Sequence, residues 1–165
     1  MKIEEEVVTR ATPRKAWDLI SDPSLHTLWN PHIVATDTAG SDTPGPGQRY
    51  RVTYELSGKR TELEAQVIEF SPETRWVARL EERIHGTGEH FDRYMVEQYT
   101  LAPHRGGTRV RHEVVIHHSG VNVFLRALIW FVMKTGKPQG QPFLDRFREL
   151  AEDEGPAGSH AAGAS

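Results

Sequence analysis

The chain has 165 residues, of which 37% are hydrophobic and 26% are charged, and its formal net charge is -3. This length and composition suit one globular domain with its own core, and the slightly negative charge gives no reason to expect a nucleic-acid partner. Cysteine is absent, which excludes disulfides and thiolate catalysis and fits a reducing cytoplasm.

The N-terminal part predicts one strand followed by two short helices. Residues 3–9 have strand character, and Thr12–Pro13 then provide a capping hydroxyl and a proline at the first helical position. Asp22–Pro23 repeat this start signal, and Asn30–Pro31 end the second helix. The first ten residues lack the apolar core of an export signal, so we expect a cytoplasmic location.

The middle of the chain predicts a run of about six strands that are linked by short turns rich in Gly, Pro and Ser. Together with the first strand they would form an antiparallel sheet of about seven strands with one apolar face. The strands are expected at residues 32–38, 48–56, 62–67, 76–80, 89–101 and 108–118.

The last third predicts helix. Apolar residues recur at helical spacing from Phe124 to Val132 and again from Phe143 to Ala151. Between them Thr135–Pro142 holds two prolines and two glycines, and it is either a mobile gate or a fixed kink. We expect one domain over residues 1–154 and a disordered tail over residues 155–165.

This order of elements predicts an α+β helix-grip fold. A sheet with one apolar face must be covered, and a long C-terminal helix is the element large enough to cover it. A strongly curved sheet that closes over one helix leaves space between them, and that space makes a ligand cavity.

Three stretches carry a resemblance to a known family. ATPRKAWDLISDPSLHTLWNP has a Pro-led helix with a tryptophan and a W-x-P stop, YTLAPHRGGTRVRHEV looks like an L-x-P…GGT hairpin, and FLDRFRELAE looks like the end of a last helix. In these features residues 2–152 resemble the Bet v 1-like, START-related superfamily (SRPBCC), especially its polyketide cyclase/dehydrase and lipid-transport branch. The resemblance implies the helix-grip fold and a small hydrophobic ligand, since members bind sterols, lipids, hormones or polyketides, and some catalyse whereas others carry.

One predicted hairpin places an acid and an imidazole on its apolar face. Glu97 keeps the phase of its apolar neighbours on one strand, and His112 does so on the next. If Leu101 faces Thr108, Glu97 lies directly opposite His112 at a Cβ separation of about 4.5 to 5.5 Å. A bulge would shift this pairing.

This pair has two interpretations. Glu97 and His112, with Tyr54 nearby, would act as catalytic acid and base in the cyclisation or dehydration of a polyketide-like substrate. Alternatively they form a buried ion pair that Arg93 and water satisfy and that makes the pocket polar, which is the commoner case.

Phase and helical spacing also select the residues that would line the cavity. Tyr50 and Tyr54 would either donate hydrogen bonds to a ligand carbonyl or pack at the rim, and packing is favoured. The residues predicted to bind the ligand are Trp29, Tyr50, Val52, Tyr54, Trp76, Arg93, Met95, Tyr99, Val114, Leu128 and Val132.

The histidines give no metal motif. His117 and His118 are adjacent on a strand and point to opposite faces, and no HExxH or cysteine ligand exists. No phosphate-binding loop is present either, so we expect neither a metal nor a cofactor. The histidines at positions 26, 32, 85, 90 and 104 are expected in loops or at the surface.

We therefore predict a protein that binds a small hydrophobic or amphipathic molecule between sheet and C-terminal helix. The alternative from another class is an aromatase/cyclase-type enzyme that uses Glu97, His112 and Tyr54. A third is a chaperone-activator-like protein that binds a partner through its outer surface. The apolar run Val121–Met133 is too short to span a bilayer, and burial is favoured over a transient membrane contact.

Overall fold

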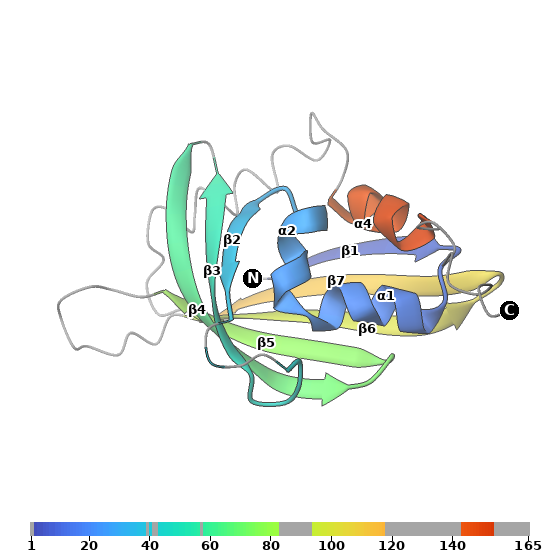
Figure 1. Ribbon diagram of the computed structural model, residues 1–165, viewed down its shortest axis with the longest axis horizontal. Coiled ribbons are helices and arrows are strands. Elements are labelled where there is room, and N and C mark those ends of the chain that lie inside the picture. The colour runs from blue at the N-terminus through green and yellow to red at the C-terminus, as the bar shows by residue number, and fades with distance from the viewer. Residues whose placement is uncertain are drawn as a thin grey trace, which may run out of the picture.

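A single curved antiparallel sheet forms the framework of this protein (Figure 1). The computed structural model describes residues 2–38, 40, 43–56, 58–82, 94–117 and 143–153. Its strand order is β1-β7-β6-β5-β4-β3-β2. The strands are β1 (Lys2–Thr9), β2 (Ile33–Asp37), β3 (Arg49–Leu56), β4 (Lys59–Ser71), β5 (Arg75–Glu82), β6 (Tyr94–His104) and β7 (Gly107–His117), and the helices are α1 (Pro13–Ser21), the 3-10 turn η1 (Pro23–Leu25), α2 (His26–Trp29) and α4 (Phe143–Glu152).

The helices begin and end where local capping signals predict. The Thr12 hydroxyl accepts a hydrogen bond from the Lys15 amide at 3.3 Å, and Pro13 begins α1. The Asp22 carboxylate likewise accepts from the Ser24 amide at 2.9 Å, at the start of η1. The second helical stretch ends at Trp29, as predicted from the Asn-Pro that follows it.

The helices lie on the same side of the sheet (Figure 1), where α1 packs on β6 and β7, α2 on β2 and α4 on β1. Helix α4 buries Leu144, Phe147 and Ala151. The Phe147 ring meets Trp29 of α2 edge-on, with ring centroids 5.4 Å apart. Around Trp29, the concave face of the sheet is therefore covered by packed aromatic and aliphatic side chains.

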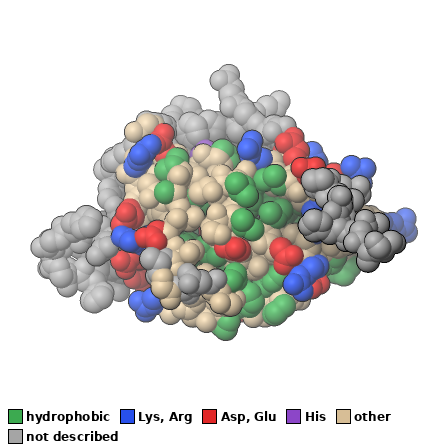
Figure 2. Space-filling view, viewed as in Figure 1, with side chains coloured by type: hydrophobic (Ala, Val, Ile, Leu, Met, Phe, Trp, Pro, Cys, Tyr) green, Lys and Arg blue, Asp and Glu red, His purple; other side chains and the backbone are tan. Residues whose placement is uncertain are grey.

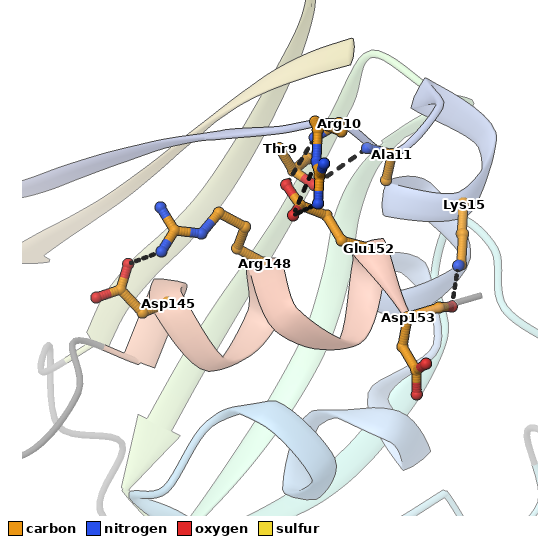
Figure 3. Close-up of polar contacts among 8 residues, drawn as sticks. All are labelled: Thr9, Arg10, Ala11, Lys15, Asp145, Arg148, Glu152 and Asp153. Carbon is orange, nitrogen blue, oxygen red and sulfur yellow. Dashed lines mark hydrogen bonds and ion pairs between the residues drawn. The ribbon is translucent and has the colours of Figure 1, made fainter. Parts of the chain in front are cut away.

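The C-terminal end of α4 is fixed to the junction between β1 and α1 (Figure 3). The Arg10 amide donates to Glu152 Oε1 at 2.8 Å, and Lys15 Nζ donates to the carbonyl of Asp153. The prediction of a helix over the last apolar repeat is confirmed. The rest of the predicted long helix, the interruption at Thr135–Pro142 and the tail lie outside the described residues.

The face seen in Figure 2 mixes acidic, basic and hydrophobic side chains, so charge of one sign does not gather on its described surface. Within the described part of the chain, no helix is both long and apolar enough to cross a membrane.

The β6–β7 hairpin turns more tightly than predicted. Its turn consists of Arg105 and Gly106 alone, and Gly106 has a φ of +74°. Leu101 pairs with Val110 and not with Thr108, so the predicted register is wrong by two residues. The strands extend further into APHRGG than its Pro and Gly content indicates. Because side chains alternate with a period of two, this slip leaves each strand's inward-facing residues unchanged.

Gly107, the residue after this turn, lies against the end of β1. A Cβ built on Gly107 would meet the Thr9 carbonyl oxygen at 2.0 Å and the Arg10 Cα at 2.7 Å. Both neighbours are backbone atoms that cannot rotate away. A side chain at position 107 would therefore separate β1 from β7.

We predict that Gly107→Ala lowers the free energy of unfolding by about 2 kcal/mol or more, since overpacked sites cost about 1 to 3 kcal/mol. Urea unfolding followed by circular dichroism measures this. Gly45→Ala is the matched control, because no atom lies within 4 Å of its added Cβ. Equal stability of the two variants would contradict the close approach.

Candidate functional site

A buried carboxylate forms the centre of the candidate site. Glu97 on β6 is 4% exposed, and its Oε1 accepts two hydrogen bonds. One comes from the Tyr99 hydroxyl at 2.8 Å and the other from His112 Nε2 on β7 at 2.9 Å. The structure thus brings Glu97 and His112 into contact on the concave face.

This contact is diagonal across the hairpin. His112 lies directly opposite Tyr99, and Glu97 lies opposite Val114. The Tyr99 and His112 rings stack, with centroids 4.5 Å apart and an interplanar angle of 17°. The predicted direct opposition of Glu97 and His112 is wrong, yet diagonal neighbours on one face remain within reach of long side chains.

Neighbouring groups stabilise the ionised form of Glu97. Burial raises the pKa of Glu97, but the hydrogen bond from His112, the electrostatic attraction of His112 and the hydrogen bond from the Tyr99 hydroxyl outweigh it. The net result is a pKa below the ordinary value of a glutamate. Glu97 is therefore a carboxylate at neutral pH.

Two tryptophans that were predicted to bind the ligand pack beside this group. Trp29 and Trp76 are fully buried, and both rings contact Tyr99, at centroid distances of 5.9 Å and 5.8 Å. Trp29 Nε1 donates to the Leu19 carbonyl at 3.1 Å, whereas Trp76 Nε1 meets no acceptor within the described residues. These rings hold Tyr99 in place.

Two further tyrosines face the same side from β3. Tyr50 is buried and Tyr54 is partly buried. Burial, and then the charge of Glu97, raises the pKa of both hydroxyls well above the ordinary value. Neither hydroxyl has a hydrogen bond to another described residue. Both are thus neutral groups that remain available for hydrogen bonding.

The other predicted lining residues divide into two groups. Val52 and Met95 are buried, and Val114 is partly buried against the same core. Three predicted residues lie outside the part of the chain that the structure describes: Arg93, Leu128 and Val132.

His26 is buried, and the prediction that it lies in a loop or at the surface is wrong. It is 2% exposed, and its Nε2 donates to the Ile20 carbonyl at 2.8 Å. Burial lowers the pKa of His26, so the ring is kept neutral. It lies three residues before Trp29 and so shares its helical face, while apolar Leu28 is 48% exposed.

Glu5 belongs to the site and was missed as a site residue. It lies directly opposite His112 across the β1–β7 ladder, so it faces the same side. Burial raises the pKa of Glu5, and the charge of His112 opposes this. Its Oε2 is buried without a partner in the described chain. Glu5 alternates in phase with Ile3 and Val7, and this pattern could have identified it from the sequence as an inward-facing residue.

Comparisons with known proteins agree on fold. A family profile described as "Polyketide cyclase / dehydrase and lipid transport" matches residues 1–152. No curated protein matches the sequence significantly.

Several solved structures share the fold at low sequence identity. Ara h 8.0201 is 14% identical, with a TM-score of 0.61 over 92% of this chain and 97% of that one. A START superfamily protein from Mycobacterium smegmatis is 14% identical, with a TM-score of 0.61 over 92% and 96%. The di-domain ARO/CYC BexL from the BE-7585A biosynthetic pathway is 19% identical, with a TM-score of 0.62 over 94% of this chain and 51% of that one. The predicted resemblance is confirmed.

We predict that His112→Phe lowers the free energy of unfolding at neutral pH by about 3 kcal/mol or more, because it leaves a buried carboxylate with one donor fewer. In the wild type the pKa of Glu97 is lowered, so its stabilisation is present above the unfolded pKa and is lost as pH falls through the folded pKa. In the variant burial dominates and the pKa of Glu97 rises, so the penalty grows as pH rises. The deficit relative to wild type should therefore be larger at pH 7 than at about pH 5.

Urea unfolding at both pH values measures this difference. His117→Phe is the matched control, because His117 is exposed and stacks on Tyr94, so the change should stay within about 0.5 kcal/mol of wild type. A His112→Phe deficit that does not depend on pH would contradict the role given to the Glu97 charge.

Proposed function

The chain belongs to the polyketide cyclase/dehydrase and lipid transport family, and we propose that it binds a small hydrophobic or amphipathic molecule on the concave face of its sheet. The ligand class is lipid-like or polyketide-like. The apolar part would lie against the aromatic wall, and one polar end would be held by the cluster around Glu97.

The observation that carries this proposal is a set of hydrogen-bonding groups left open in an apolar surface. Glu97, Tyr50 and Tyr54 face one side of the sheet, where a core without a ligand would favour fully paired or apolar side chains. We include Arg93, Leu128 and Val132 in the proposed lining, as the sequence predicts.

A second candidate is an enzyme of the aromatase/cyclase type. The observation in its favour is the hydrogen bond of 2.9 Å between Glu97 and His112, since an acid paired with an imidazole is the usual basis of general acid–base catalysis. The neighbour BexL is described as an ARO/CYC protein. In this version His112 and Glu97 move the proton and Tyr54 donates to a substrate carbonyl.

The binding proposal predicts that the purified protein carries a small molecule. Native mass spectrometry should find an added mass that denaturation releases, and its identity then supplies the ligand for titration. Tyr54→Phe should weaken its binding about threefold to tenfold by removing one hydrogen bond, with little change in stability because this hydroxyl has no partner in the described chain.

Tyr94→Phe is the matched control, since Tyr94 stacks on exposed His117 at the other side of the strand. The proposal would be contradicted if both substitutions weakened binding equally. It would also be contradicted if the protein retained no molecule and bound neither lipids nor aromatic polyketides.

The enzyme candidate predicts a different result for Glu97→Gln. Turnover of a polyketide-like substrate should fall at least about a hundredfold, the lower end for a general acid–base group, while the dissociation constant stays within about tenfold. Turnover measured at saturating substrate separates a loss of catalysis from a loss of binding. Unchanged turnover in the variant would remove Glu97 from catalysis.

A further inference from the structure

The hydrogen bonds of Glu97 limit the polar group that a ligand can bring to it. Both donors, Tyr99 and His112, bind Oε1, and no other described residue donates to Oε2. An ionised carboxylate has only acceptor positions. The open position beside Glu97 therefore suits a group that carries a hydrogen to donate.

The charges around this position also disfavour an anion. Glu5 places a second carboxyl group opposite His112, so this imidazole lies between two acidic side chains. No Lys or Arg occurs among the buried residues of the described segments. A carboxylate or phosphate at this position would meet Glu97 in a medium of low dielectric without a described cation to balance it.

The tyrosines of β3 add a complementary group. The Tyr50 and Tyr54 hydroxyls have no partner in the described chain, and a neutral phenol donates as well as accepts. A carbonyl or ether oxygen of the ligand would suit these hydroxyls, whereas Glu97 accepts from a ligand hydroxyl. The tyrosine hydroxyls would thus bind an oxygen of the ligand, and Glu97 would bind a hydroxyl of the ligand.

We infer that the site selects an uncharged ligand that presents a hydroxyl or phenol to Glu97 Oε2, and that it rejects free carboxylates and phosphates. This inference rests on the proposed binding function and narrows its ligand class. It separates alcohol-bearing and phenol-bearing molecules from fatty acids and phospholipids, although all of them are amphipathic.

The test uses two matched series of probes on the full chain after its retained molecules have been removed. The chain series is dodecanol, dodecyl methyl ether and dodecanoate, and the ring series is naphthol, methoxynaphthalene and naphthoate. Isothermal titration calorimetry at neutral pH gives the affinities. In the series that fits the proposed site, the hydroxyl compound should bind about tenfold more tightly than the ether and at least about tenfold more tightly than the acid.

Glu97→Gln tests which residue sets the preference. The amide can turn its NH2 toward the ligand, so it can donate to a carboxylate and carries no charge to repel one. The ratio of hydroxyl to acid affinity should therefore fall about tenfold. Glu62→Gln, an exposed change on β4, should leave the ratio unchanged. Urea unfolding of each variant confirms that it folds.

The outcomes separate this inference from the function on which it rests. Tighter binding of the hydroxyl compound, lost in Glu97→Gln, supports both. If the acid binds as tightly as the hydroxyl compound, or more tightly, the inference is wrong but the binding function stands. Such a result would point to a cation such as Arg93 at the site. Binding of no member of either series overturns the proposed function and the inference together.

Discussion

The two-residue turn between β6 and β7 determines which side chains of the concave face lie opposite one another. Arg105 and Gly106 close the hairpin so that Tyr99 and His112 face each other, and Glu97 then reaches His112 on the diagonal. Gly107, without a side chain, lets the end of β1 lie directly on β7. The β1–β7 ladder in turn sets Glu5 opposite His112. A different turn length would change the pairing of β6 with β7, and with it the contacts among Glu97, Tyr99 and His112.

A carboxylate as buried as Glu97 costs several kcal/mol of desolvation unless its partners compensate. Tyr99 and His112 supply that compensation, but both act on one oxygen. Apolar residues of similar volume often serve a core equally well or better than a buried ion pair. Stability alone therefore does not explain why Glu97 and His112 are buried here. A ligand that donates a hydrogen bond to Oε2 of Glu97 would explain it.

Local signals in this sequence predict local structure, but they do not predict contacts between residues far apart in the chain. The cap at Thr12 and the alternation that turns Glu97 and His112 inward depend on a few adjacent residues. The hairpin register does not, because it depends on where two strands stop, and a slip by an even number preserves the face. Glu5 was missed as a site residue because its partner lies on β7, more than a hundred residues away. His26 was missed because a polar residue in a short helix was expected at the surface, whereas the structure buries His26 and exposes apolar Leu28.

The electrostatics of Glu97 and the three tyrosines suit holding a ligand better than moving a proton. A general acid or base works best when its pKa lies near the working pH. Here the pKa of Glu97 is lowered, which makes it a weak base, and burial raises the pKa values of Tyr50, Tyr54 and Tyr99, which makes them weak acids. Both shifts move away from neutrality. Catalysis by Glu97 as the base would require a substrate that displaces His112 from Oε1 and so raises the pKa of Glu97 toward neutral pH. A ligand that only adds a donor at Oε2 lowers that pKa further and strengthens the site as an anchor.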